Sequence, residues 1–309
     1  MVKHAKAILF LVGLSTSFLV ADRSISFLLN QVVRKSEFRY AKLYHSHLNA
    51  DILVLGNSRG VNGFFAPSME TELGESVFNL SLNGLDIDLL GNALKDYCER
   101  NAAPKMVILE ITSLHSDDAI GGLRFLMSDS PRMDKLLKDA NYRDWILCNA
   151  CTVYQYNTEL FLRVIYFLSK SDQGWINDGV VDPEVARNWK VSTKEKELWN
   201  EPTGKKVKGL LELVRFADQE KIPVKLVIGP YMRGYTDQFD NYQRWKSAVQ
   251  DAVGPDHPIY DFSNAIENEL NFADMVHLNR QGSIEFFHQL REAGFFVRPS
   301  IDRLNERVN

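Results

Sequence analysis

Residues 51–60 read DILVLGNSRG. The first half is a short, continuous apolar run ended by Gly56 and Asn57, which is typical of a strand buried on both faces of a parallel sheet. The second half places Ser58 on the turn that leaves the carboxyl end of this strand. Ligands of open α/β sheets bind along that edge. This stretch therefore predicts an α/β fold and a first candidate site residue, with a turn residue or helix N-cap as the simpler interpretation of the serine.

Four further runs of the same kind follow along the chain, and helical patterns separate them. The runs are residues 76–82, 106–112, 224–229 and 258–262. Apolar side chains recur at three-and-four spacing over residues 89–100, 206–220 and 280–294. Strands that alternate with helices, joined by right-handed crossovers, predict a three-layer α/β/α domain with a five-stranded parallel sheet.

The interval 113–205 is too long for one crossover. It is rich in aromatic residues and predicts two or three amphipathic helices. We expect a helical insertion, within a domain that spans residues 50–300, that serves as a cap over the carboxyl edge of the sheet or as a partner surface. Residues 34–49 form a polar connector in front of this domain.

The first 33 residues differ in composition from the rest. Lysines at positions 3 and 6 precede an apolar run over residues 7–21, and residues 25–33 continue it. A cleaved signal peptide needs small residues at the last and third-last positions, and Leu19 does not fit. We therefore expect an uncleaved signal anchor, an N-terminal transmembrane helix over residues 1–33. A cleaved signal peptide and an amphipathic first helix of a cytoplasmic protein are the alternatives.

The charges that flank this run predict its orientation. Basic residues precede the run and few follow it, which places the amino terminus in the cytoplasm. The sequence thus predicts a single-pass protein of the inner (cytoplasmic) membrane, with its domain in the periplasm or outside.

Composition excludes several other classes of protein. The 309 residues are 45% hydrophobic and 25% charged, which is unlike a disordered or polytopic membrane chain. A net charge of -4 supplies no general electrostatic case for a nucleic-acid partner.

Cysteine and histidine spacing predicts neither a metal site nor another bound cofactor. Three cysteines are too few for a disulfide scaffold. His45 and His47 lack a third ligand. Cys148 and Cys151 have the spacing of a redox CxxC, but they fall in a helical stretch, which favours an incidental or structural pair.

A second candidate site lies near the carboxyl terminus, where Asp274 and His277 sit between the last strand and the final helix. A histidine that acts on a serine needs a carboxylate to hold its tautomer and to balance the imidazolium charge. On its own the pair also fits a surface loop in which Asp274 caps a turn.

Taken together, Ser58, the Asp-x-x-His spacing and the five-strand pattern resemble the SGNH (GDSL-type) hydrolase superfamily. The chain looks most like membrane-anchored bacterial SGNH-like proteins, many of which belong to cell-envelope or exopolysaccharide pathways. The stretches that carry this closer likeness are residues 50–59, 78–79, 83–84 and 274–278. Residues 56–60 also fit the nucleophile elbow of α/β hydrolases, but that fold places its Asp and His on separate loops.

The resemblance implies a flavodoxin-like SGNH fold and a triad of Ser58, His277 and Asp274. It implies a serine esterase or O-acyltransferase that acts on acyl esters, acetyl esters in particular, of an envelope glycan or exopolysaccharide. The substrate would be an acylated saccharide or another ester, and no cofactor would be needed. Hydrolase and transferase remain open, and the alternative is a catalytically degenerate binding or assembly component of a polysaccharide pathway.

The family's oxyanion donors match this chain in part. They are the backbone N–H of the nucleophile, here Ser58, a glycine N–H after strand two, here Gly84, and an asparagine side chain after strand three. The third strand here ends in EITS and has no asparagine. Asn83 and Thr112 are the candidate replacements.

Three other residues are candidates for binding substrate. Arg59 could bind a carboxylate or phosphate, although an exposed salt bridge is the simpler role. Tyr231 and Arg233 follow the fourth strand at the same edge, and either a cleft wall or an ordinary loop fits them.

Overall fold

The computed structural model describes residues 2–115, 120–189 and 204–297. Its centre is a sheet of five parallel strands in the order β2-β1-β3-β4-β5. The strands are β1 (Ile52–Leu55), β2 (Val77–Asn79), β3 (Met106–Glu110), β4 (Val224–Ile228) and β5 (Ile259–Asp261). This is the flavodoxin-like order of doubly wound sheets. The predicted α/β class and all five predicted strands are confirmed.

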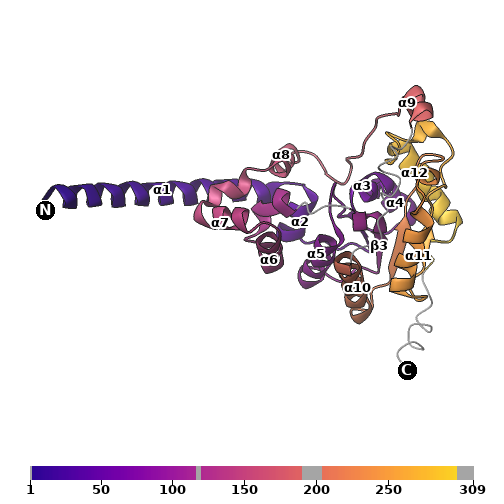
Figure 1. Cartoon of the computed structure of the whole chain (residues 1–309), viewed down its shortest axis with the longest axis horizontal. Helices are drawn as coiled ribbons and strands as arrows, with labels where there is room; N and C mark the ends of the chain where they lie inside the picture. Colours follow the sequence, from indigo (N-terminus) through magenta and orange to yellow (C-terminus); the bar gives the residue numbers. More distant parts are fainter. Residues whose placement is uncertain (1, 116–119, 190–203, 298–309) are drawn as a thin grey trace.

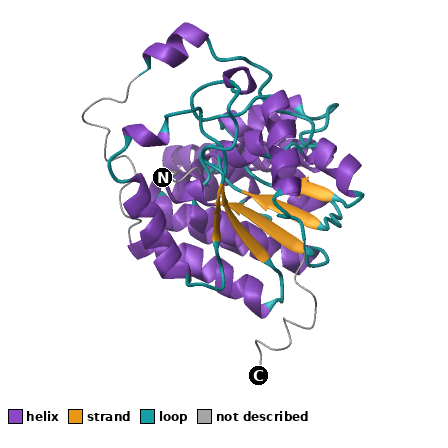
Figure 2. Cartoon of the chain, turned by 90° about the vertical axis from the view of Figure 1, so that its right-hand side faces the viewer, coloured by secondary structure: helices purple, strands orange, loops and turns teal. Residues whose placement is uncertain are grey.

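Helices cover both faces of the sheet (Figure 2), because successive side chains of each strand point to opposite sides. In β1, Leu53 and Leu55 face one apolar cluster, whereas Ile52 and Val54 face the other. The first cluster contains α5 (Ile87–Arg100), α10 (Gly204–Gln219) and α11 (Tyr242–Val253). The second contains α4 (Ala66–Leu73) and α12 (Arg280–Glu292). The chain is thus the three-layer sandwich that the sequence predicts.

A helical insertion follows β3, as predicted. Its elements are η1 (Ile111–His115), η2 (Ile120–Leu126), α6 (Pro131–Ala140), α7 (Tyr142–Ala150), η3 (Thr152–Tyr156), α8 (Glu159–Tyr166) and α9 (Pro183–Asn188). Residues 116–119 and 190–203 of the predicted insertion, and residues 298–300 of the predicted domain, lie outside the described ranges.

The position of this insertion differs from a cap over the carboxyl edge. Helices α6, α7 and α8 gather around the amino-terminal helix α1 (Val2–Lys35) and beside α2 (Arg39–His45) and α5, whereas α9 lies at the other end of the molecule near α12 (Figure 1). One segment returns to the carboxyl edge, where the backbone N–H of Asn177 donates to Asn62 Oδ1 at 3.2 Å. The amide of Asn279 donates to the carbonyl of Gly179 at 3.1 Å.

The helix α1 has two unlike halves. Every residue from His4 to Ala21 is exposed, and among the described helices α1 alone is long and apolar enough to cross a membrane, as a membrane anchor or a signal sequence is. Farther along, Asp22 is 4% exposed and Val33 is fully buried. The second half of α1 therefore packs against the domain along one face, while Ile25, Phe27 and Leu28 on its other face stay exposed.

The polar connector predicted over residues 34–49 contains a buried helix instead. Tyr40 and Leu43 of α2 are fully buried. Arg39 is buried with them because Asp172 accepts hydrogen bonds from its Nε at 2.7 Å and its Nη2 at 3.0 Å. Charged residues stand between the apolar ones, so the sequence pattern does not predict a buried helix here.

Candidate active site

The serine at the end of β1 is the first residue of α3 (Ser58–Gly63). Asn57 caps this helix, because its Oδ1 accepts the backbone N–H of Arg59 at 2.9 Å. The amide of Asn62 donates to the carbonyl of Ser58 at 2.8 Å and fixes the first turn. As the first residue of the helix, Ser58 has a backbone N–H outside the helical hydrogen-bond ladder.

Two glycines let α3 lie directly against the ends of the strands. A Cβ on Gly56 would stand 2.9 Å from Cβ of Glu110, and a Cβ on Gly60 would stand 2.4 Å from Oγ of Ser81. A side chain at either position would therefore push α3 away from the sheet. Glycine is therefore needed at positions 56 and 60 because α3 lies so close to the ends of the strands.

A closed loop between η5 (Glu269–Asn271) and α12 carries the histidine. An isolated bridge pairs Phe272 with Leu278, and the N–H of Ala273 donates to the carbonyl of His277 at 2.9 Å. Inside the loop, Asp274 Oδ1 accepts the backbone N–H of Val276 and that of His277, both at 2.9 Å. The carboxylate thus organises the backbone that presents the imidazole.

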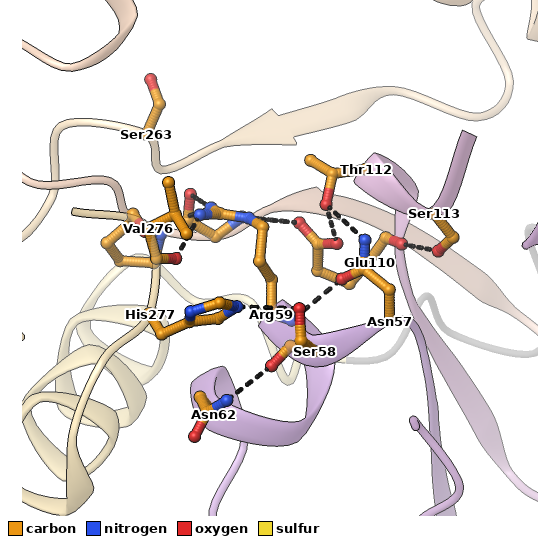
Figure 3. Close-up of polar contacts among 12 residues, drawn as sticks. Asn57, Ser58, Arg59, Asn62, Glu110, Thr112, Ser113, Ser263, Val276 and His277 are labelled. Atoms are coloured by element: carbon orange, nitrogen blue, oxygen red, sulfur yellow. Dashed lines mark hydrogen bonds and ion pairs between the residues drawn. The ribbon is translucent and has the colours of Figure 1, made fainter. Parts of the chain in front are cut away.

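The serine and the histidine meet although 219 positions separate them (Figure 3). His277 Nε2 lies 2.8 Å from Ser58 Oγ, and His277 Nδ1 lies 2.8 Å from Asp274 Oδ2. With the Nδ1 proton donated to the carboxylate, Nε2 carries the lone pair that can accept the serine proton. This is the relation that a nucleophile, its base and the group that orients the base require.

The side chain of Asp274 is held in its ionised form. Burial alone would raise the pKa of Asp274, but hydrogen bonds from the His277 ring and from the backbone N–H groups of Val276 and His277 outweigh it. The pKa therefore lies below its ordinary value. At neutral pH the ionised carboxylate of Asp274 can accept a hydrogen bond from Nδ1–H of His277. It can also balance the positive charge when His277 becomes an imidazolium.

Arg59 is buried, so it does not form the exposed salt bridge expected for it, and backbone carbonyls of the chain accept hydrogen bonds from its guanidinium. The residue is 8% exposed. Its Nη1 donates to the carbonyl of Val276 at 2.6 Å, and its Nη2 donates to the carbonyls of Gly229 at 2.5 Å and Pro230 at 3.1 Å. Arg59 thereby ties the serine-bearing helix to the loop after β4 and to the histidine-bearing loop (Figure 3).

Glu110, at the end of β3, faces this guanidinium and is fully buried. Its Oε1 lies 3.4 Å from Arg59 Nε and 3.4 Å from the backbone N–H of Gly229. Thr112 donates its hydroxyl proton to Oε2 of the same carboxylate and receives the Asn57 amide at 3.3 Å. Because this proton is already donated, the geometry does not support Thr112 as an oxyanion donor.

Sequence reasoning missed the role of Glu110. The available signal was an acid inside the otherwise apolar run MVILEIT, which a buried strand tolerates only when the charge is paired. The partner could not be named, because Arg59 lies 51 positions away.

The other predicted site residues differ in their burial and surroundings. Gly84 has φ +76° in an exposed turn closed by the Leu85 N–H and the Leu82 carbonyl, and Asn83 is exposed beside it. Tyr231 is 3% exposed and lies beneath the Arg59 guanidinium, 3.4 Å from ring centroid to Cζ.

Tyr231 therefore packs against the Arg59 guanidinium and does not line a cleft. Burial raises the pKa of Tyr231 well above the usual range. Arg233, two residues farther on, is exposed.

Within the described ranges, no group of three His, Cys, Asp or Glu side chains could hold a metal ion. His45 lies 3.4 Å from Asp129. Cys148 and Cys151 are free thiols, and Cys151 Sγ donates to Asp22 Oδ1 at 3.2 Å. This contact gives the second cysteine a structural place against α1.

Comparison with known proteins gives distant structural similarity only. No protein-family model matches the chain, and no curated protein matches its sequence. A similar solved structure is a protein from Streptococcus pneumonia provisionally named a platelet activating factor, with 12% identity, a TM-score of 0.41 and coverage of 94% of this chain and 98% of that one. Another, from Bacteroides fragilis NCTC 9343, is provisionally named an acylhydrolase, with 10% identity, a TM-score of 0.37 and coverage of 84% and 88%. Similarities of this size carry no conclusion about the activity of this chain.

Proposed function

We propose that this chain is an SGNH-type serine esterase or O-acyltransferase with Ser58, His277 and Asp274 as its triad. One observation carries the proposal, namely the unbroken series of contacts from Ser58 Oγ through both ring nitrogens of His277 to Asp274, with a length of 2.8 Å at each end. The lowered pKa of Asp274 supports the same roles.

The reaction proceeds through an acyl-serine. Ser58 Oγ forms a bond to the ester carbonyl carbon while its proton passes to His277 Nε2, and Asp274 balances the imidazolium. The bond from that carbon to the alcohol oxygen then breaks, and the alcohol leaves with the His277 proton. Water or a sugar hydroxyl next attacks the acyl-serine, gives its proton to His277, and Ser58 regains a proton as its bond to the carbon breaks.

The developing oxyanion needs donors fixed in advance. We assign the backbone N–H groups of Ser58 and Gly84 to this role, each worth roughly 3 to 4 kcal/mol in the transition state. The turn that contains Gly84 is held beside the strand end, since the N–H of Leu82 donates to the carbonyl of Gly56 at 3.2 Å. The exposed amide of Asn83 is the candidate for a third donor.

The substrate we propose is an acyl ester, acetyl in particular, of an envelope glycan or exopolysaccharide. The support is the apolar exposed half of α1, which fits a membrane anchor, and the two lysines before it. These features favour a domain on the outer side of the inner membrane.

The test is covalent labelling of the full-length protein in detergent with a fluorescent fluorophosphonate, in which Ser58 Oγ displaces fluoride from phosphorus. We expect labelling of the wild type, loss of labelling in Ser58→Ala, and strong slowing in His277→Ala. Ser68→Ala is the matched control, because Ser68 is also half-buried but lies on α4. Acetate release from an aryl acetate and from an acetylated glycan then identifies the acyl group.

Failure of the folded wild type to label or to release acetate would contradict the proposal. That result would favour the alternative, an anchored binding or assembly component of a polysaccharide pathway.

A further inference from the structure

Asp22 of α1 accepts hydrogen bonds from the helical insertion. The carboxylate of Asp22 accepts the backbone N–H of Thr152 at 3.0 Å, the hydroxyl of the same threonine at 2.7 Å and the N–H of Val153 at 2.9 Å. Ser26, one turn farther on, lies 2.7 Å from the same hydroxyl, Oγ to Oγ1. These contacts fix where α1 stops being free and becomes part of the domain.

The exposed apolar face of α1 continues past Asp22. Ile25 is 47%, Phe27 63% and Leu28 63% exposed, so the outward apolar surface of this helix extends beside the insertion. The hydrocarbon core of a bilayer is about 30 Å thick. If α1 crosses it, this continuous apolar face places the protein around Asp22 at the level of the hydrocarbon.

The part of the domain at that level is α7. Figure 1 shows α7 as the part of the insertion nearest to the projecting half of α1, and its C-cap residue Cys151 contacts Asp22. The helix turns apolar side chains outward at helical spacing, with Tyr142 58%, Ile146 44% and Leu147 37% exposed. A surface of this kind in water would cost free energy that contact with acyl chains removes.

The residues beside this surface are those of a membrane–water boundary. Tyr142 stacks on Trp145 at 5.6 Å, and Lys138 Nζ lies 4.9 Å from the Trp145 ring. Arg143 is exposed and follows Tyr142 in the chain, and the exposed Arg23 follows Asp22 on α1. Aromatic rings with nearby cations are typical of the headgroup layer, and this favours a lipid surface over a protein partner.

We propose that α7 is a membrane-seating element: its Tyr142, Ile146 and Leu147 face enters the outer leaflet of the bilayer that α1 crosses. The proposal rests on the membrane-anchor part of the proposed function and is independent of the catalytic part. The domain is thereby held at a fixed height above the membrane and does not swing on a tether.

The test is photocrosslinking of the full-length protein in bacterial membranes whose phospholipids carry a radiolabel. The photoreactive residue p-benzoylphenylalanine replaces Ile146, Phe10 or Ile165 in separate variants. Phe10 lies in the free half of α1 and reports whether the anchor is in lipid. Ile165 is the matched control, because it is 46% exposed but belongs to α8, which contacts Ser36 just past the end of α1, about 20 Å beyond Asp22.

We expect phospholipid adducts at positions 10 and 146, with a yield at position 165 at least several-fold lower. An adduct at position 10 without one at 146 would overturn the seating and leave the anchor intact, whereas no adduct at position 10 would overturn the anchor itself. A protein adduct in place of lipid at 146 would assign this face to a partner and overturn the proposal. Equal lipid yields at 146 and 165 would overturn α7 as the seating element.

Discussion

Asp274 does two things at once, since it holds the loop backbone and the imidazole. Replacing it with asparagine keeps an oxygen for the two backbone N–H groups, so we expect Asp274→Asn to fold. Turnover should fall by two or more orders of magnitude, because His277 loses both its tautomer and its counter-charge. Steady-state kcat beside a thermal melt checks this, and an unchanged kcat would contradict the role of Asp274.

The lowered pKa of Asp274 also makes a prediction about stability against pH. The stabilisation from a carboxyl whose native pKa is depressed is fully present above its unfolded value, near 3.8, and is lost as pH falls through the lower native value. The difference in Tm between wild type and Asp274→Asn should therefore be constant from pH 7 to about 5 and should close below about 4. Melts across this range test it, and a constant difference down to pH 3 would refute it.

Substitutions in the buried pair of Arg59 and Glu110 should change stability and activity independently of each other. Glu110→Gln leaves the guanidinium buried without its counter-charge, which should cost roughly 3 to 5 kcal/mol of unfolding free energy. Adding Arg59→Met should recover part of that stability, because no unpaired buried charge remains.

Activity should not recover in this double variant, since the Val276 carbonyl next to His277 has lost its donor. Denaturant unfolding and kcat report the two effects, with the exposed Glu292→Gln as control. Recovery of kcat together with stability would show that Arg59 has no positioning role.

At the scale of single residues, the sequence pointed to residues near the active edge of the sheet. It missed the buried residues that support them, Glu110 and Arg59. Ser58 could be predicted as a site residue because it follows a parallel strand at the binding edge of the sheet. His277 was predicted with it through the spacing to Asp274 and the family resemblance, because the pair alone also fits a surface loop. The partner of Glu110 and the burial of Arg59 depend on side-chain packing between segments that are distant in the chain, and no local pattern encodes that.

Among the elements, α3 owes its position to the absence of a side chain at Gly60. Gly60→Ala should destabilise the protein by roughly 1 to 3 kcal/mol, because the new Cβ meets Ser81 Oγ at 2.4 Å and Cβ at 2.9 Å. Gly63→Ala on the same helix is the control, since nothing lies within 4 Å of its Cβ position.

Ser81→Gly should restore the stability of Gly60→Ala, because it removes both contacting atoms. Within the described chain the hydroxyl of Ser81 has no hydrogen-bond partner to lose. Equal unfolding free energies for Gly60→Ala and Gly63→Ala would refute the close approach.

The sequence predicts the five strands because each is a continuous apolar run, a pattern that burial on both faces imposes. It does not predict α2, where the buried Tyr40 and Leu43 alternate with Arg39 and Lys42. The charge of Arg39 is buried only because Asp172, 133 positions away, is there to accept its hydrogen bonds.

For the molecule as a whole, Asp22 is one of the residues that hold α1 against the insertion. Asp22→Ala leaves the N–H groups of Thr152 and Val153 without their acceptor. Hydrogen bonds to a charged group contribute about 1.5 to 3 kcal/mol each. We expect a lower Tm and faster proteolysis between α7 and α8, with Ser24→Ala, an exposed residue of the same helix, as control. Equal proteolysis of the two variants would contradict this.

The helix α1 runs without a break from its exposed half into the domain, and this limits how its first half can be replaced by another anchor. A transmembrane segment attached through a flexible linker is an interchangeable part, and evolution or a cloning experiment can substitute one for another. Here the helix proposed as the anchor also supplies Asp22, Ser26 and Val33 to the domain. Replacing residues 1–33 with a foreign transmembrane helix would leave η3 without its acceptor, so α1 and the domain that follows it have to be exchanged as one module.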